Sequence, residues 1–215
     1  MHTFKKKIYM DRLFPPLPGD NYTRLQIDNE SVAYITPYNL AVMTVGILMK
    51  HHTDLKRMVV MDMTGGVGGD TIILSSRVGY VVSAEIMSDR YMMLRNNLEV
   101  YGIKNAYTVC GNSVEIFEKL NFIDIVYIDP PWGGAVYKEQ RTLRLMFDGM
   151  SIERLVCRIF DPLQLSRVKT CCMKLPLNYD IESLYSETKH LDIMHYLYRL
   201  DKMFIMIIQK KCYME

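Results

Sequence analysis

The stretch that decides the fold is Asp129-Pro130-Pro131-Trp132-Gly133-Gly134, which follows residues 123–128, an apolar run interrupted once by Asp124. Residues 123–128 read as a buried strand, and a strand cannot continue its hydrogen-bond ladder through two prolines. The chain therefore leaves the sheet at its carboxyl edge, where open α/β sheets bind their ligands. At this edge the stretch offers a carboxylate acceptor, a large aromatic face and two glycines that permit close approach. These features suit the binding of a flat, aminated heterocycle.

Length and composition indicate one folded domain. The chain has 215 residues, of which 49% are hydrophobic and 23% charged, as is usual for globular proteins. A formal net charge of +2 is too small for a protein that wraps long nucleic acid, although local cations could hold a short nucleic-acid end. The five cysteines lack the spacing of a zinc site, so we expect reduced thiols and no metal. No apolar run reaches the ~20 residues of a membrane span, so we expect no membrane binding. We also expect the protein to be intracellular and a monomer.

Two regions differ in their local sequence. Residues 1–35 include three prolines and a glycine within residues 15–19, so we expect an irregular arm that contributes to substrate binding. Lys5-Lys6-Lys7 in this arm is either a phosphate contact or a solvated charge cluster. Thr36-Pro37 reads as a helix N-cap followed by proline at the first helical position. The catalytic domain is therefore expected to span residues 36–215.

A glycine-rich turn follows the next apolar run. Residues 58–61 lead into Asp62-Met63-Thr64-Gly65-Gly66-Val67-Gly68-Gly69-Asp70-Thr71, the pattern of a ligand-binding turn between a strand and a helix. Asp62 ends this strand and Glu85 ends the next one, where a carboxylate can accept hydrogen bonds from ribose hydroxyls. Asp70 occupies the place that a lysine takes in a phosphate-binding loop, and its charge would repel a pyrophosphate.

A ligand with a ribose but without phosphates therefore fits this turn best. S-adenosylmethionine is such a ligand, and its sulfonium and ammonium charges favour a carboxylate such as Asp62. A third predicted strand, residues 106–109, leads to Asn112. The amide oxygen of Asn112 could accept a hydrogen bond from an adenine amino group, or the side chain could cap the following helix, and the two roles are compatible.

The alternation of strand and helix patterns predicts a Rossmann-like α/β fold. Residues 193–200 and 203–209 are joined by Asp201-Lys202 and read as an antiparallel hairpin. We therefore expect a seven-stranded, mostly parallel sheet that ends in this hairpin, with helices on both faces.

Several of these segments together resemble the class I S-adenosylmethionine-dependent methyltransferases. More narrowly, they are similar to the trimethylguanosine synthase family, the RNA cap guanine-N2 methyltransferases. The similarity covers roughly residues 30–210 and is carried by residues 35–37, 62–71, 85, 95–102, 129–134 and 175–180. An Asp-Pro-Pro-aromatic element alone marks amino-methyltransferases in general. Pro-Pro-Trp-Gly-Gly combined with Gly-Gly-Val-Gly-Gly is more specific to the cap family.

The resemblance implies methyl transfer to the exocyclic N2 amine of a 7-methylguanosine RNA cap, with S-adenosylmethionine as cofactor and capped RNA as partner. The product would be a 2,7-dimethylguanosine or 2,2,7-trimethylguanosine cap. Asp129 and the Pro130 carbonyl would accept the two N–H bonds of the amine and aim its lone pair at the methyl group. Pro131 and Trp132 would hold the base, and a cation–π contact with 7-methylguanine is worth ~2 kcal/mol in a dry pocket.

The same resemblance implies the remaining site residues. The cofactor would be bound by Asp62, Thr64, Gly66, Gly68, Glu85, Asn112 and Asp129, and the substrate by Lys5, Thr36, Pro131, Trp132 and Asn178. Three positions differ from the family pattern. The residue before Pro-Pro can be a serine in the family and is Asp129 here. Asn112 stands where family members have an acid for the adenine, and Leu177 stands where a family arginine contacts the cap triphosphate.

Two other functions stay open on the sequence. A methyltransferase for a guanine or adenine amine elsewhere in RNA or DNA would be active on uncapped substrates. A non-catalytic cap- or RNA-binding module would not bind S-adenosylmethionine, and the presence of the glycine turn, Glu85 and Asp129 argues against it.

Overall fold

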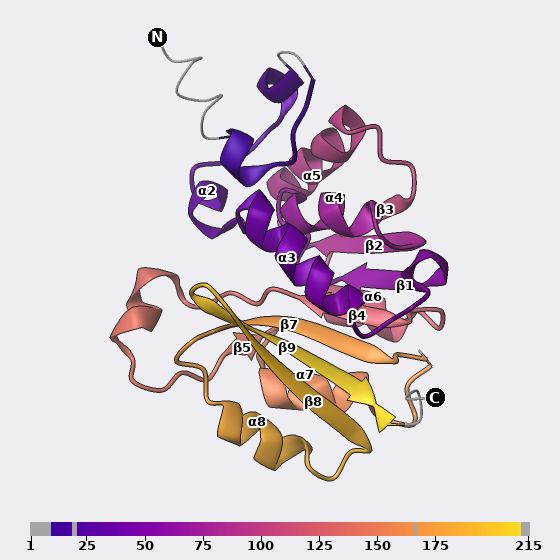
Figure 1. Cartoon of the computed structure of the whole chain (residues 1–215), viewed down its shortest axis with the longest axis vertical. Coiled ribbons are helices and arrows are strands. Elements are labelled where there is room, and N and C mark those ends of the chain that lie inside the picture. Colours follow the sequence, from indigo (N-terminus) through magenta and orange to yellow (C-terminus); the bar gives the residue numbers. More distant parts are fainter. Residues whose placement is uncertain (1–9, 19–20, 166, 212–215) are drawn as a thin grey trace. The chain divides into compact units, whose positions relative to one another are not determined.

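Strands and helices alternate along the chain, as the sequence predicts (Figure 1). The computed structural model describes residues 10–18, 21–165 and 167–211. The strands of the main sheet are β1 (Val59–Asp62), β2 (Tyr80–Glu85), β3 (Ala106–Cys110), β4 (Ile125–Ile128), β7 (Thr170–Pro176), β8 (Ile193–Leu200) and β9 (Met203–Lys210). They form one seven-stranded sheet in the order β3-β2-β1-β4-β7-β9-β8. β9 is antiparallel to both of its neighbours, so the predicted carboxy-terminal hairpin is confirmed.

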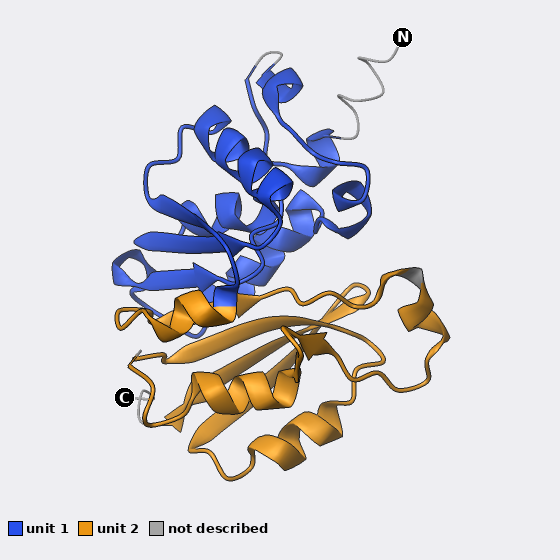
Figure 2. Ribbon diagram, turned by 180° about the vertical axis from the view of Figure 1, so that it is seen from behind, with its two compact units in different colours: residues 1–113 blue, residues 114–215 orange. Residues whose placement is uncertain are grey.

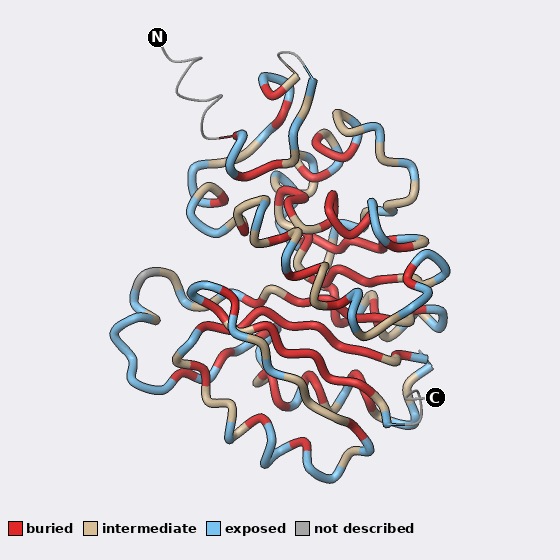
Figure 3. The backbone as a smooth tube through the Cα atoms, viewed as in Figure 1, coloured by how far each residue is buried: buried red, intermediate tan, exposed pale blue. Residues whose placement is uncertain are grey.

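The first of two compact units spans residues 1–113 (Figure 2). Its strands β1, β2 and β3 are parallel to one another. Its helical segments are η1 (Asn21–Arg24), α2 (Ser31–Tyr34), α3 (Tyr38–Met49), η2 (Leu55–Arg57), α4 (Gly69–Ser75) and α5 (Ser88–Val100). α4 and α5 contact the strands, and α3 packs on α4. Because β1 and β2 are buried almost throughout, their sequences are mainly apolar up to the carboxylate that ends each strand (Figure 3).

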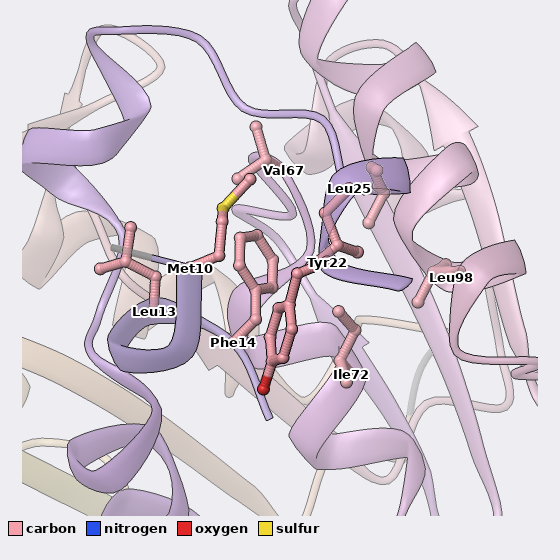
Figure 4. Close-up of a cluster of buried hydrophobic side chains, with 9 residues drawn as sticks. Met10, Leu13, Phe14, Tyr22, Leu25, Val67, Ile72 and Leu98 are labelled. Carbon is pink, nitrogen blue, oxygen red and sulfur yellow. The ribbon is translucent and has the colours of Figure 1, made fainter. Parts of the chain in front are cut away.

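The described part of the predicted arm shares a core with this unit. Figure 4 shows its buried side chains against those of the glycine turn, α4 and α5. The cluster comprises Met10, Leu13, Phe14, Tyr22 and Leu25 from the arm with Val67, Ile72, Leu94 and Leu98. The Tyr101 hydroxyl also donates a hydrogen bond to the Pro15 carbonyl at 2.6 Å. Apolar burial and hydrogen bonding therefore fix this segment next to the glycine turn.

The second unit spans residues 114–215 (Figure 2). Besides β4 and β7 to β9, its elements are α6 (Ser113–Glu118), η3 (Gly134–Glu139), β5 (Met146–Phe147), β6 (Met150–Ser151), α7 (Ile152–Ile159) and α8 (Ile181–Thr188). Every residue of β7 is buried, and α7 packs on α8. The Ser151 and Asp180 side chains accept hydrogen bonds from backbone N–H groups in the first turns of α7 and α8, which explains where these helices begin.

Two local predictions need correction. The helix that we expected to be capped by Thr36 begins at Tyr38, with Pro37 at the N-cap position, so Thr36 is not its N-cap. The extended ψ angle of 141° at Pro37 places this residue outside the helix. β5 and β6 were not expected, because two-residue strands are too short to show a periodicity. Within the described ranges, no helix is long and apolar enough to cross a membrane, and no group of three or more His, Cys, Asp or Glu residues could hold a metal ion.

Candidate active site

The turn between β1 and α4 carries several of the predicted cofactor residues. Gly66 and Gly68 have φ angles of 50° and 97°, a left-handed conformation that favours glycine. A Cβ atom at Gly65 would lie 2.5 Å from Ser83 Oγ, so this part of the turn packs directly on β2. A Cβ atom at Gly66 would meet only the Thr64 carbonyl oxygen, at 3.9 Å. The turn is therefore held closely on one side and accessible to a ligand at Gly66.

Glu85 fastens this turn to the end of β2. One of its carboxylate oxygens accepts a hydrogen bond from the Gly66 N–H and the other accepts from the Met87 N–H, both at 2.8 Å. A carboxylate has about four lone-pair sites, so both oxygens keep the capacity to accept a second hydrogen bond. Glu85 can therefore position the turn and accept hydrogen bonds from ribose hydroxyls at the same time.

Asp62 is a buried carboxylate beneath the turn, and its residue is 1% exposed. It accepts hydrogen bonds from the Thr64 N–H at 3.1 Å and from the Thr71 hydroxyl at 2.6 Å. The Thr71 hydroxyl also lies 2.9 Å from Ser83 Oγ. These hydrogen bonds stabilise the turn and place a negative charge below it, which is favourable for a ligand that carries positive charge.

Asn97 is a buried residue of α5 that the sequence analysis did not single out. Its amide nitrogen donates to the carbonyl oxygens of Val67 and Gln26, and its amide oxygen accepts from the Gln26 N–H, each at 2.8 Å. One side chain thus connects the glycine turn to the arm. The only signal in the sequence was an amide next to Leu98, at a core position of a helix. A buried polar side chain needs hydrogen-bond partners, so such a position indicates a structural contact.

Asn112 and Thr36 lie at two other positions of the same unit. Glu85 pairs in register with Cys110, and the Gly111 N–H donates to the Glu85 carbonyl at 2.9 Å, so Asn112 follows at the same edge of the sheet. Asn112 immediately precedes α6, a position that suits adenine binding and helix capping alike. Thr36 is buried between α2 and α3.

In the second unit, Asp129 follows β4 and is paired with a buried lysine. Lys174 Nζ donates to Asp129 Oδ2 at 3.2 Å, and the Lys174 and Asp129 side chains are 1% and 23% exposed. Ile128 pairs with Met173 across β4 and β7, so Asp129 and Lys174 are the next residues of two neighbouring parallel strands. Lys174 Nζ also lies 5.5 Å from the centroid of the Tyr127 ring. No pattern in the sequence identified Lys174.

Trp132 lies in the turn after Asp129 and packs against Tyr137. The two ring centroids are 5.3 Å apart at an interplanar angle of 81°, an edge-to-face arrangement. Trp132 is half-buried, and its indole Nε1 is buried without a hydrogen-bond partner. Pro130 is buried, whereas Pro131 is exposed. The indole is therefore positioned by its packing against the Tyr137 ring and not by a hydrogen bond of its own nitrogen.

Asn178, predicted as a substrate ligand, anchors the same turn. Its amide nitrogen donates to the carbonyl oxygens of Tyr137 and Gln140 at 2.7 and 2.8 Å, and its amide oxygen is buried without a hydrogen-bond partner. Gly133 and Gly134 have φ angles of 89° and 69°, so the reversal of the chain before η3 requires glycine at both positions. Asn178 thus fixes the segment that begins with this reversal.

Arg144 belongs to a charged cluster near this segment. Arg144 forms ion pairs with Glu153 and Glu187. Glu153 is fully buried and accepts a hydrogen bond from the Tyr179 hydroxyl at 2.6 Å. Burial alone would raise the pKa of Glu153, but the hydrogen bond from Tyr179 and the ion pair with Arg144 help to outweigh it and lower that pKa. Arg144 is therefore occupied by carboxylates of its own chain.

Comparison with known proteins identifies the family. The family model of RNA cap guanine-N2 methyltransferases matches residues 57–215, well over half of the chain. The chain belongs to this family. Protein L320 of Acanthamoeba polyphaga mimivirus, which is uncharacterized, is 31% identical over 232 residues, covering 98% of this chain and 87% of that protein. Trimethylguanosine synthase of Schizosaccharomyces pombe is 30% identical over 118 residues, covering 52% of this chain and 47% of that protein.

A solved structure with the same fold is that of the T. thermophilus 16S rRNA N2 G1207 methyltransferase RsmC in complex with AdoMet and guanosine. It has a TM-score of 0.60 at 15% identity, covering 86% of this chain and 44% of that chain. The similarity confirms the predicted class I methyltransferase fold. S-adenosylmethionine is the cofactor of this cap guanine-N2 methyltransferase family member, as predicted. The turn fits such a cofactor, because Gly66 is accessible, Glu85 has spare acceptor sites and Asp62 supplies negative charge.

The structure groups the predicted site residues of this methyltransferase into two sets. One set lies in the first unit at the glycine turn and the ends of β2 and β3, and comprises Asp62, Thr64, Gly66, Gly68, Glu85 and Asn112. The other lies in the second unit and comprises Asp129, Pro130, Pro131, Trp132 and Asn178. Lys5 lies outside the described residues. The contacts of each residue with cofactor or substrate stay predictions.

Proposed function

We propose that this chain transfers a methyl group from S-adenosylmethionine to the exocyclic N2 amine of a 7-methylguanosine RNA cap. The observation that carries the proposal is the segment of residues 129–132. It joins a carboxylate fixed by a buried lysine to an indole packed edge-to-face on Tyr137. Membership of the cap guanine-N2 family and similarity to a trimethylguanosine synthase support the same substrate. Capped RNA is the macromolecular partner that this reaction requires.

Asp129 and Pro130 would act by orienting the amine. The lone pair of the guanine N2 amine is delocalised into the ring, so the amine is a poor nucleophile until its N–H bonds are held. The Asp129 carboxylate and the Pro130 carbonyl can accept these two N–H bonds and direct the lone pair. Positioning of two reactants can lower a barrier by ~7–11 kcal/mol. The cofactor supplies an electrophilic methyl group: the N–C bond forms, the S–C bond breaks, and the amine then loses one proton to water.

Trp132 would select for the methylated base. A 7-methylguanine ring is positively charged, and a cation over an indole face gains ~2 kcal/mol when desolvated. This corresponds to about thirtyfold in affinity, because each 1.4 kcal/mol is about tenfold. The protein would therefore prefer a cap that is already methylated at N7 over an unmethylated guanosine.

The proposal is tested by methyl transfer from radiolabelled S-adenosylmethionine to a panel of substrates. We expect turnover of 7-methyl-GTP and of 7-methylguanosine-capped RNA, and much lower turnover of GTP and of uncapped RNA with the same sequence. Mass analysis of the isolated cap nucleotide then shows whether one or two methyl groups are added. Equal turnover of 7-methyl-GTP and GTP contradicts the preference for a base methylated at N7. Turnover of uncapped RNA alone contradicts the proposal and indicates an amine elsewhere in RNA.

A further inference from the structure

A buried lysine beside the proposed catalytic carboxylate requires an explanation. Lys174 is the one lysine among the fully buried residues of the described part of the chain. It lies in β7, whose other residues are all buried as well. Removal of an ammonium group from water costs several kcal/mol unless the charge is paired and hydrogen-bonded. A buried ion pair is weak evidence of added stability, since well-packed apolar residues of similar volume often do as well.

The partner of this lysine is the residue on which the proposed reaction depends. Lys174 Nζ donates to Asp129 Oδ2 at 3.2 Å and lies 5.5 Å from the centroid of the Tyr127 ring. The strand register fixes this pairing, because Ile128 and Met173 are opposed one residue earlier. The Lys174 side chain is thus buried in the core, whereas the Asp129 side chain that it contacts is 23% exposed.

We infer that Lys174 is a positioning residue that holds Asp129 as an ionised acceptor for the N2 amine. The inference rests on the proposed function and specifies how the same site works. The hydrogen bond to Lys174 fixes the carboxylate and favours its charged form, because a nearby cation stabilises an anion. The carboxylate has about four lone-pair sites in all, so it can still accept an N–H bond of the substrate.

This assignment also defines the route of the proton. Asp129 paired with a cation is a poor proton acceptor, so it orients the amine and does not remove its proton. After the N–C bond has formed and the S–C bond has broken, the proton of the methylated amine passes to water. The Asp129–Lys174 pair carries no net charge before or after the reaction. The sulfonium group of the cofactor and the 7-methylguanine base, which are positively charged, would therefore lie near a fixed dipole whose negative end is the carboxylate.

The test is a double-mutant cycle with 7-methyl-GTP as substrate. Lys174→Met removes the charge at similar length, and we expect kcat to fall by ~100-fold, the size of a small misplacement of a catalytic group, with little change in the KM for S-adenosylmethionine. In an Asp129→Asn background, the same substitution should change kcat by less than about threefold, because the residue that it positions is already lost. An equal fall of kcat in both backgrounds, or an unchanged kcat in Lys174→Met alone, overturns the inference.

The chain offers a matched control at the other end of the same two strands. Lys169 Nζ lies 2.9 Å from Asp124 Oδ1, in an ion pair whose lysine is more exposed than Lys174 and which takes no part in the proposed site. Lys169→Met should leave kcat within about twofold of the wild type. A loss comparable to that of Lys174→Met shows that removal of any lysine in or next to β7 disturbs the fold, and overturns the inference.

A measurement on the wild-type protein covers the case in which the variants do not fold. Nitrogen–proton correlation spectra selective for lysine side chains should show one ammonium signal that is protected from exchange near neutral pH and that moves on addition of 7-methyl-GTP. A lack of any protected ammonium signal overturns the inference. A protected signal in a protein that methylates no guanine substrate supports the ion pair and counts against the proposed function alone.

Discussion

Glu85 lies 2.8 Å from the backbone nitrogen of Gly66, so the carboxylate at the end of β2 holds the turn that follows β1. Its other oxygen accepts from the Met87 N–H at the same distance. Such a carboxylate usually accepts hydrogen bonds from the ribose hydroxyls of the ligand. Here the same group also determines where the backbone of the glycine turn lies, and a change at Glu85 should affect cofactor binding through both routes.

Glu85→Gln should weaken cofactor binding by about 10–100-fold. The glutamine side chain keeps the shape, but its NH₂ group replaces one carboxylate oxygen and cannot accept, so one of the two backbone hydrogen bonds and the negative charge are lost. A hydrogen bond to a charged group contributes ~1.5–3 kcal/mol. Titration calorimetry with S-adenosylhomocysteine measures the change. Glu99→Gln, at an exposed position of α5, is the matched control and should bind normally. Equal affinity of wild type and Glu85→Gln contradicts the assignment of Glu85 to the cofactor site.

Asn178→Ala should impair the use of the guanine substrate and leave the cofactor affinity near that of the wild type. Loss of its hydrogen bonds to the carbonyl oxygens of Tyr137 and Gln140 releases the segment that packs on Trp132. Two neutral hydrogen bonds contribute ~0.5–1.5 kcal/mol each, so we expect kcat/KM for 7-methyl-GTP to fall by roughly tenfold or more. Steady-state kinetics measure this change, and Asn121→Ala, at an exposed position, is the control. An unchanged kcat/KM in Asn178→Ala excludes a role for this anchor.

Asp28 should make folding stability depend on pH in the acid range. Its burial would raise the pKa of Asp28, but hydrogen bonds from Ser31 and Arg90 outweigh it and lower that pKa from 3.8 to about 2. Because the folded-state pKa is the lower one, this stability is present above about pH 4 and is lost as the pH falls to about 2. The change in pKa corresponds to about 2 kcal/mol.

Urea unfolding at about pH 7 and about pH 2 tests this dependence. Asp28→Asn should lower the free energy of unfolding by about 2 kcal/mol at the higher pH and by little at the lower pH. At about pH 2 the Asp28 carboxyl is roughly half protonated in the folded protein and almost fully protonated in the unfolded protein, so little of its stabilising effect remains. Asp192→Asn breaks a more exposed ion pair, with Lys211, and should change stability by less than ~0.5 kcal/mol at both pH values. An equal effect of Asp28→Asn at both pH values would show that the charge of Asp28 is not what stabilises the fold.

The sequence was sufficient for features that depend on neighbours along the chain. Two prolines after Asp129 end β4, the glycines at Gly66 and Gly68 mark backbone that only glycine readily adopts, and Glu85 ends β2 as predicted. The cofactor followed from the same pattern, because a glycine turn followed by a carboxylate at the next strand end is local in sequence.

The sequence was not sufficient for contacts between distant residues. Lys174 is 45 residues from Asp129, and Asn97 is 71 residues from Gln26. Only the strand register and the packing of α5 bring these pairs together, and a single lysine in an apolar strand has no periodicity that reveals its partner. Thr36 was misjudged for a different reason: proline is accepted both at the first helical residue and just before it, so the start of α3 is uncertain by a residue or two from sequence alone.

Trp132 should control the preference for 7-methylguanine without contributing a hydrogen bond to the fold. Its indole nitrogen is buried and has no hydrogen-bond partner, so Trp132→Phe removes an unsatisfied polar group and should leave the free energy of unfolding within about 1 kcal/mol. The smaller ring has a weaker cation–π interaction, and the ratio of kcat/KM for 7-methyl-GTP over GTP should fall severalfold. Trp132→Ala should abolish turnover of 7-methyl-GTP while S-adenosylhomocysteine still binds with near wild-type affinity. Comparison of kinetics, calorimetry and unfolding across the two variants separates these effects, and a parallel loss of cofactor affinity in Trp132→Ala would show that the indole does not act on the base alone.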